Sequence, residues 1–196
     1  MRLSRCSAML SFAVMALCSI GFADTITFSA ATPGDLGVKT QTFTSGSSSI
    51  TLTGYLFDAI KSDLYFKDGK GGEKGIGLTG TAHNEIGPGF VQFLSAGVDS
   101  LLLSSLQPGE EWALYGSSAA GATEDTLIAT GTGKLVNLSG DDGYTYISIG
   151  AANGDFLIKS ARVEDNVRAS EPGTPALMMT LGLVGLFVFN RRKLFT

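Results

Sequence analysis

Short runs of alternating hydrophobic and polar residues recur between residues 24 and 168. Residues 25–29 and 49–53 alternate hydrophobic with hydroxyl-bearing side chains, which is the period-two pattern of a half-buried β-strand. Residues 90–94 and 101–103 are more continuously hydrophobic, and we expect them to form more fully buried strands. No run keeps the 3.6-residue period of an amphipathic helix. The pattern therefore predicts strands and not helices.

Turn-forming residues separate these runs. Pro33-Gly34, Pro108-Gly109 and Asn153-Gly154 are typical turn pairs. About ten short strands follow one another at the spacing of a sandwich, and no fixed-length repeat favours a solenoid. We expect an all-β fold, with a single β-sandwich or jelly-roll-like domain over residues 24–168.

The first residues have the three parts of a secretory signal peptide. Arg2 and Arg5 precede a hydrophobic stretch over residues 9–20, and small residues stand one and three places before the bond between Ala23 and Asp24. We expect a signal peptide over residues 1–23 with cleavage at that bond. An uncleaved membrane anchor is the alternative.

The C-terminal residues carry a second targeting pattern. Residues 169–175 contain two prolines and a glycine, which favour an extended, accessible linker. A hydrophobic run over residues 176–189 follows, shorter than the roughly 20 residues of an untilted membrane helix. A basic cluster after it would stay cytoplasmic. We expect a transmembrane helix with a basic tail over residues 176–196, and a buried core helix is the alternative.

This arrangement resembles the PEP-CTERM sorting signal of Gram-negative bacteria, which joins a Pro-Glu-Pro motif, a short helix and an Arg-rich end. Ser170 stands where the first proline of the motif belongs. The matching positions are Glu171, Pro172, Gly173, Thr174, Arg191, Arg192 and Lys193. The resemblance implies export by the Sec translocon, an inner-membrane intermediate and cutting by an exosortase-type membrane protease. It also implies release to the cell surface or the extracellular matrix, with exopolysaccharide or biofilm as the associated material.

Charge and cysteine content narrow the function of the exported part. All 18 acidic residues but only nine basic ones lie between Asp24 and Glu171, so this segment has a net charge of −9. Nucleic-acid binding is not expected, because it needs a basic face. Cys6 and Cys18 both lie in the signal peptide. The remaining segment therefore has no disulfide, thiolate metal site or cysteine nucleophile.

Few residues indicate catalysis. Residues 75–80 match G-x-G-x-x-G, but no helical run follows to bind a pyrophosphate, so we interpret them as a glycine-rich strand and turn. His83 is the single histidine and no G-x-S-x-G motif accompanies it, which favours a turn histidine. Glu85, Glu110 and Glu111 would supply acid–base chemistry if a cleft brought them together. Glu110 and Glu111 are more simply a solvated turn, and we expect no catalytic residue.

Calcium is the one cofactor for which the sequence offers candidate ligands. Carboxylates in glycine-containing loops offer the hard oxygen ligands that calcium prefers, although their spacing matches neither an EF-hand nor a calcium-binding repeat. These residues are Asp68, Glu73, Asp141, Asp142 and Asp155. We expect no cofactor, with a structural calcium ion as the alternative.

Aromatic residues are the remaining candidates for binding. Trp112 alternates onto the same face as Leu114, which favours a place in the core. In residues 144–149 the alternation predicts that the two tyrosines point to one face and Ile147 and Ile149 to the other. Exposed aromatic rings stack on sugars in lectin-like sandwiches. The candidate sugar contacts are Tyr115, Tyr144 and Tyr146.

The sequence thus favours a non-enzymatic, exported surface or matrix protein that associates with exopolysaccharide. Three alternatives stay open: a carbohydrate-binding module, a C-terminally anchored periplasmic protein, and a secreted hydrolase that uses carboxylates.

Overall fold

The computed structural model describes residues 23–56, 60–138 and 143–164. The predicted signal peptide up to residue 22, the linker with its sorting motif, the C-terminal helix, Asp141 and Asp142 lie outside the described residues. Within the described ranges no helix has the length and hydrophobicity to cross a membrane. The same ranges contain two short 3-10 turns and no α-helix.

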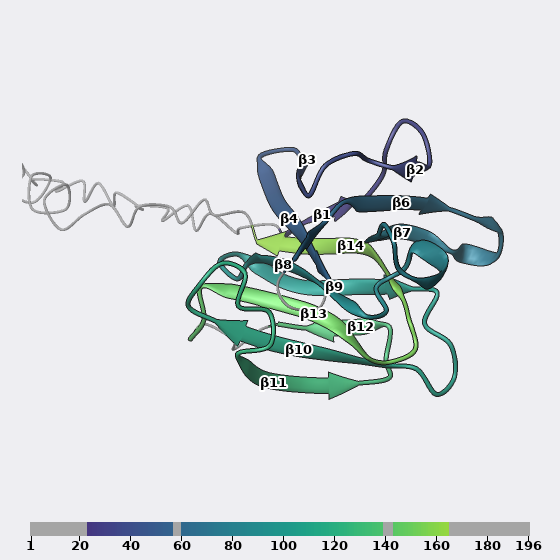
Figure 1. Ribbon diagram of the computed structural model, residues 1–196. Coiled ribbons are helices and arrows are strands. Elements are labelled where there is room, and N and C mark those ends of the chain that lie inside the picture. The colour runs from purple at the N-terminus through teal and green to yellow at the C-terminus, as the bar shows by residue number, and fades with distance from the viewer. Residues whose placement is uncertain (1–22, 57–59, 139–142, 165–196) are drawn as a thin grey trace, which may run out of the picture. The chain divides into compact units, whose positions relative to one another are not determined.

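The described strands form two antiparallel sheets (Figure 1). In the first, sheet A, the order is β12-β9-β14-β7-β6-β2, and β1 also pairs with β14. Its strands are β1 (Ala23–Thr27), β2 (Gly34–Asp35), β6 (Leu64–Asp68), β7 (Lys74–Leu78), β9 (Val98–Ser104), β12 (Leu135–Asn137) and β14 (Leu157–Glu164).

In the second, sheet B, the order is β11-β10-β13-β8-β4-β3, and β5 pairs with β4. Its strands are β3 (Thr40–Ser45), β4 (Ser48–Leu56), β5 (Lys61–Ser62), β8 (Gly89–Leu94), β10 (Glu111–Ser117), β11 (Thr126–Gly131) and β13 (Tyr146–Asn153). From β8 onward the chain crosses between the sheets repeatedly, so strands that are neighbours in sequence often lie in different sheets.

One hydrophobic core is shared by the two sheets. Alternate residues of each strand point into it, because successive side chains of a strand point to opposite faces. Sheet A contributes Ile26, Leu64, Phe66, Ile76, Leu78, Leu101 and Leu103, and sheet B contributes Leu52, Val91, Phe93, Leu114, Ile147 and Ile149. The predicted all-β, sandwich-like fold is confirmed.

Three finer predictions are also confirmed. Trp112 lies in the core, and its indole N–H donates a 2.8 Å hydrogen bond to the Gly133 carbonyl oxygen. Residues 75–80 are part of β7 and the turn after it. His83 lies in the 3-10 turn Ala82–Asn84.

The predicted orientation of Tyr144 is wrong. β13 begins only at Tyr146, so the period-two alternation does not extend back to Tyr144. The Tyr144 ring packs against the core over Gly116, which is paired with Ile147 and so faces the core. Tyr146 is paired with Ser117 and faces the opposite way. The two tyrosines therefore lie on different sides of sheet B.

Candidate functional site

The outer face of sheet B, which points away from the core, carries a row of residues that crosses six strands. Each is the cross-strand partner of the next, so their side chains share one face. From β3 to β11 the row is Thr40, Thr53, Gln92, Ser148, Tyr115 and Leu127. Hydroxyl groups, one amide and one phenol thus lie side by side across the sheet.

A loop covers the centre of this row. Residues 118–125, which we call the strap, connect β10 to β11. Both polar atoms of the Gln92 amide bind the middle of the strap. The amide oxygen accepts a hydrogen bond from the Gly121 N–H at 2.8 Å, and the amide nitrogen donates one to the Ala122 carbonyl oxygen at 3.3 Å. The same nitrogen donates to Ser148 Oγ at 3.0 Å. Gln92 is 3% exposed, so this buried amide has its hydrogen-bond partners in the strap and in β13.

Aromatic rings lie on the same outer face of sheet B, and Tyr55 comes close to the strap, since a Cβ at Gly121 would lie 3.8 Å from its ring. Gly150 leaves space for the Phe90 ring, since a Cβ at Gly150 would come within 2.5 Å of it. The ring thereby reaches Tyr115 edge-to-face, with 5.7 Å between the centroids. Tyr55 is buried, and burial raises the pKa of its phenol. Burial also raises the pKa of Tyr115, and the nearby carboxylate of Glu124 adds to that shift.

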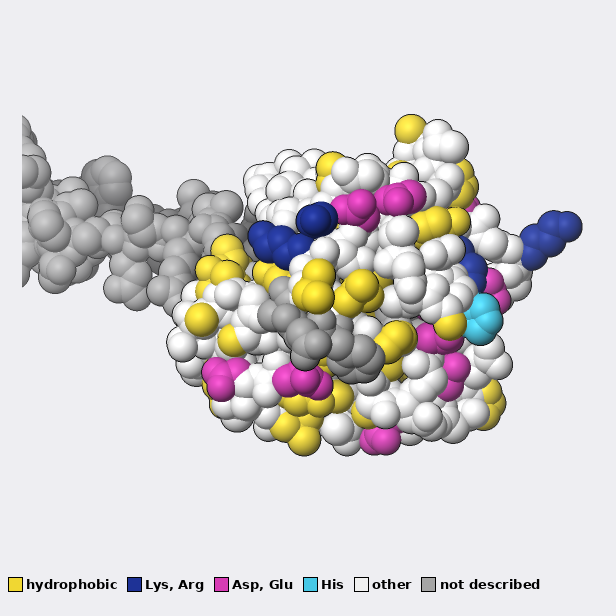
Figure 2. Space-filling view, in the orientation of Figure 1, with side chains coloured by type: hydrophobic (Ala, Val, Ile, Leu, Met, Phe, Trp, Pro, Cys, Tyr) yellow, Lys and Arg dark blue, Asp and Glu magenta, His cyan; other side chains and the backbone are white. Residues whose placement is uncertain are grey.

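Next to the strap, apolar and aromatic side chains reach the surface. Tyr115 and Tyr146 are half-buried, while their cross-strand partners Leu127 and Leu94 are 56% and 53% exposed. We call these four residues the tyrosine patch. Figure 2 shows hydrophobic side chains beside acidic ones over β10 and β11, at the bottom of the view, whereas the basic side chains in that view lie over other elements. Of the three candidate sugar contacts, the structure brings two together and separates Tyr144 from them.

The carboxylate candidates occupy a different place. Glu85 follows the 3-10 turn and its side chain is 3% exposed. Its Oε1 accepts from Lys67 Nζ at 2.5 Å and from Ser105 Oγ at 3.0 Å, while its Oε2 is buried without a partner. Burial raises the pKa of the Glu85 carboxyl, against the opposing effect of Lys67. Lys67 also contacts Glu73 at 3.0 Å, so one ammonium group serves two carboxylates.

Unusual backbone conformations cluster around Glu85. Among the described non-glycine residues, positive φ angles occur at His83 (61°), Asn84 (54°) and Ser105 (66°). The first two directly precede Glu85, and the third donates a hydrogen bond to it. Such conformations persist only where the surrounding structure enforces them. The fold therefore uses strained backbone to hold this buried carboxylate.

The other carboxylate candidates are engaged in local contacts. Glu110 accepts from the backbone N–H groups of Gln107 and Asp155, at 2.5 and 3.4 Å. Glu111 is simply the first residue of β10. The Asp155 carboxylate contacts His83 Nδ1 at 3.0 Å, and this hydrogen bond raises the pKa of the imidazole. Glu110 thus braces a turn, as expected for a structural residue.

The calcium candidates that are described each have another partner. Asp68 contacts Lys74 at 3.0 Å, Glu73 contacts Lys67, and Asp155 contacts His83. Over the described part of the chain, no three His, Cys, Asp or Glu side chains are grouped so as to hold a metal ion.

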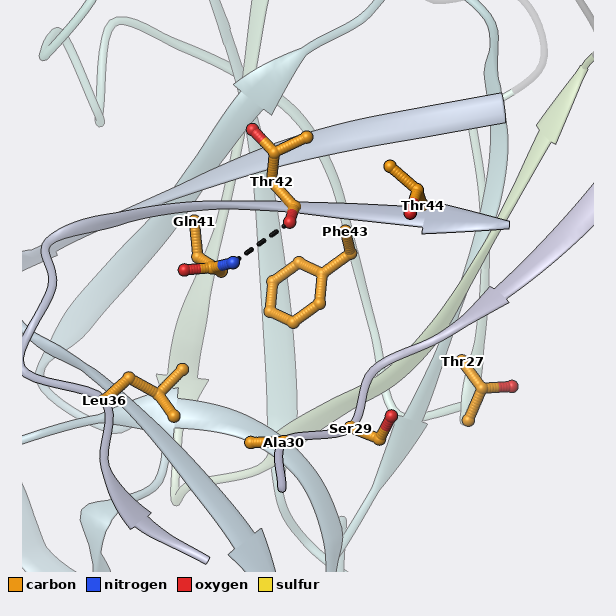
Figure 3. Close-up of a pocket in the computed structure, with 8 residues that line it drawn as sticks. All are labelled: Thr27, Ser29, Ala30, Leu36, Gln41, Thr42, Phe43 and Thr44. Atoms are coloured by element: carbon orange, nitrogen blue, oxygen red, sulfur yellow. Dashed lines mark hydrogen bonds between the residues drawn. The ribbon is translucent and has the colours of Figure 1, made fainter. Parts of the chain in front are cut away.

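A groove of about 360 Å³ lies beside β3, at the edge of sheet B (Figure 3). Phe43 and Gln41 point into it from β3, and Ala30 and Leu36 face them from the chain around β2. The lining residues are Thr27, Ser29, Ala30, Leu36, Gln41, Thr42, Phe43 and Thr44. None of these side chains carries a charge.

Sequence reasoning missed Gln92 and this groove. Gln92 interrupts a hydrophobic strand, which is a signal of a special role, but its partner loop lies about 30 residues away. The groove combines residues on both sides of β2 with residues of β3, and nothing in their local pattern joins them. Comparison of the chain with protein-family models, with curated proteins and with solved structures finds no match.

Proposed function

We propose that this chain is a non-enzymatic, exported surface or matrix protein whose body binds polysaccharide. In this proposal a single jelly-roll-like sandwich stands between a signal peptide and a C-terminal transmembrane helix with a PEP-CTERM-like sorting signal. The Sec translocon and an exosortase-type protease are its processing partners.

The observation that carries the binding function is the tyrosine patch. A tyrosine offers an apolar ring face for the C–H groups of a sugar and a hydroxyl for its polar groups. Tyr115 is held edge-to-face by Phe90, so little conformational freedom is left for it to lose on binding. The exposed Leu94 and Leu127 extend the apolar surface on both sides. Isolated exposed leucines are ordinary, but two of them beside two tyrosines on one sheet face favour a binding surface.

The environment of the carboxylates supports a function without catalysis. Glycoside hydrolysis needs two carboxyl groups that face a substrate cleft. Glu85 is buried and paired with Lys67, and Glu110 accepts hydrogen bonds from two backbone N–H groups. Both groups have structural partners, which favours a structural role over acid–base work.

Affinity gel electrophoresis tests the binding function. The exported protein is run through gels containing exopolysaccharide from the producing bacterium, dextran or alginate. We expect retardation by at least one polymer, with Tyr115→Ala and Tyr146→Ala each removing most of it. Tyr65→Ala is the matched control, because Tyr65 is a half-buried tyrosine of β6 in sheet A. Unretarded wild-type protein in all three gels would refute the binding function.

Intact-mass measurement tests the sorting. The full chain is expressed with an exosortase, and we expect a product that ends near residues 170–175, outside the inner membrane. Ser170→Pro restores the motif's first proline and should raise the processed fraction. A product in the membrane fraction that retains Arg191–Lys193 would instead indicate a C-terminally anchored periplasmic protein.

A further inference from the structure

The groove beside β3 has the layout of a small-ligand site. Its volume of about 360 Å³ lies within the range of roughly 300–1,000 Å³ typical of such sites. Phe43 and Leu36 are half-buried and form an apolar floor, whereas Thr27 and Ser29 are exposed at the rim. The ring of Phe43 is fixed by an edge contact with Phe28, with 4.8 Å between the centroids. A rigid apolar floor with hydroxyls around it is thus ready before any ligand arrives.

The lining excludes charged ligands. The exported segment has 18 acidic residues and a net charge of −9, yet no carboxylate and no cationic side chain lines this groove. An anionic ligand would find no counter-charge, and a metal ion would find no carboxylate. Hydroxyls, one amide and backbone groups are the polar partners on offer, and they suit a ligand that is itself rich in hydroxyl groups.

The amide of Gln41 adds directionality. Its nitrogen donates a 3.1 Å hydrogen bond to the Thr42 carbonyl oxygen (Figure 3). This bond fixes the amide against the backbone of β3. The amide oxygen is an acceptor and can take a hydrogen bond from a ligand hydroxyl. The amide therefore offers a directional polar contact beside the apolar floor.

The outer face of β3 continues the hydroxyl surface. Thr42 Oγ1 lies 2.8 Å from Thr51 Oγ1, and Thr40 Oγ1 lies 3.1 Å from Thr53 Oγ1. These cross-strand pairs fix the hydroxyls at the regular spacing of neighbouring strands. A polymer that leaves the groove over β3 meets hydroxyl groups that are already positioned.

We propose that this groove is a second carbohydrate site, separate from the tyrosine patch, and that it takes an uncharged sugar unit stacked on Phe43. Its position between β3 and the chain around β2 makes it independent of Tyr115 and Tyr146, which lie on β10 and β13. It extends the proposed function by assigning a second place on the body to neutral glycans.

NMR titration of the isotope-labelled exported protein tests this inference. The probes are maltotriose and cellotriose, which are neutral, and an alginate trisaccharide, which is anionic. We expect at least one neutral trisaccharide to shift the amide resonances of residues 27–30 and 41–44, and the alginate trisaccharide to leave them unchanged. Tyr115→Ala should leave this binding intact.

Two groove variants and one control complete the test. Gln41→Leu keeps the side-chain size but removes the amide, and we expect affinity to fall about tenfold. Ser29→Val removes a hydroxyl from the exposed rim and should weaken binding similarly. Thr130→Val, an exposed position on β11 at the opposite edge of sheet B from β3, is the control for folding and should bind the groove probe as wild type does.

Three outcomes would overturn the groove proposal: neither neutral trisaccharide shifts the groove resonances, alginate binds there as tightly, or both groove variants bind like wild type. The polymer gels separate this failure from failure of the proposed function. If polysaccharide retards the protein in a Tyr115-dependent way but neither trisaccharide shifts the groove resonances, only the groove proposal is refuted and the proposed function stands.

Discussion

Glu85 is a charged side chain that the fold removes almost completely from water. Lys67 and Ser105 satisfy one carboxylate oxygen, and the other has no partner. A buried carboxylate is tolerated only while its counter-charge is present, since an uncompensated charge in the interior is costly. Loss of Lys67 is therefore expected to lower the free energy of unfolding, because it would leave the Glu85 carboxylate buried without a cation.

Replacing Lys67 with methionine tests this expectation. Lys67→Met keeps the apolar stem but leaves Glu85 without a cation, and we expect the free energy of unfolding to fall by about 3 kcal/mol. Glu85→Gln keeps the shape of the side chain and should cost less. The double variant should be more stable than Lys67→Met alone, because it removes the orphaned charge. Urea unfolding of the three proteins gives these values, and equal losses in Lys67→Met and the double variant would contradict the argument.

His83 gives a second prediction at the residue scale, one that depends on pH. Its hydrogen bond and charge interaction with Asp155 raise the pKa of the imidazole above the ordinary value of 6.5. Because the folded-state pKa is the higher one, protonated His83 stabilises the fold fully below pH 6.5. This contribution is lost as the pH rises through the folded-state pKa.

The measurement is simple because the chain has a single histidine. We expect the NMR titration of the ring to have its midpoint above 6.5 in the wild type and nearer 6.5 in Asp155→Asn. The stability difference between the two proteins should shrink as the pH rises. A wild-type midpoint at or below 6.5 would show that the contact with Asp155 does not persist in solution.

At the scale of the elements, a single glycine lets the segment before Glu85 pack on β7. A Cβ at Gly77 would collide with the backbone carbonyl oxygen of Asn84 and come within 2.9 Å of the Glu85 Cα. Backbone atoms cannot swing aside as a side-chain end does. The close approach of these two segments therefore requires glycine at this position.

Gly77→Ala is expected to lower the free energy of unfolding by about 1–3 kcal/mol, the usual cost of overpacking. Gly133→Ala is the matched control, because the nearest atom to its Cβ would be the Leu135 carbonyl oxygen at 4.0 Å. Urea unfolding compares the two. Similar stabilities of both variants would mean that β7 and the segment before Glu85 separate at little cost.

The strap gives a prediction about local opening. Two hydrogen bonds from Gln92 hold it over sheet B, and its sequence is rich in small residues. Gln92→Leu removes both bonds and leaves the Gly121 N–H without its acceptor. We expect faster proteolytic cleavage within residues 118–125 than in the wild type. Mass spectrometry of the fragments locates the cuts and gives their rates. Thr51→Val, on the same outer face, should be cut at the wild-type rate, and an unchanged rate in Gln92→Leu would mean that other contacts hold the strap.

Strands and core were predictable from local pattern, but the arrangement of sites was not. Alternation identifies Ile147 and Ile149 as core residues, because hydrophobic residues at every second position of a strand mark its buried face. It fails for Tyr144, because the pattern does not say where β13 begins. The partners of Glu85 lie 18 and 20 residues away in sequence. Such contacts depend on which strands share a sheet, and alternation does not contain that information.

For the whole molecule, the order of the strands links the two sheets into one unit. After β8 the chain passes to sheet A at β9, returns to sheet B at β10 and β11, and crosses again at β12, β13 and β14. β1 pairs with β14, so the two ends of the described body join in one sheet. Neither sheet is a continuous stretch of chain. Breaking one sheet therefore also exposes the core face of the other.

This topology predicts a single cooperative unfolding transition. Trp112 is the only tryptophan and lies in the shared core, so its fluorescence reports on the packing of the sheets. Far-UV circular dichroism reports on the strands themselves. We expect the two signals to change together in urea, as in a two-state domain. If fluorescence changed at a lower urea concentration than circular dichroism, the sheets would come apart before their strands unpair, and the shared core would not be what holds each sheet together.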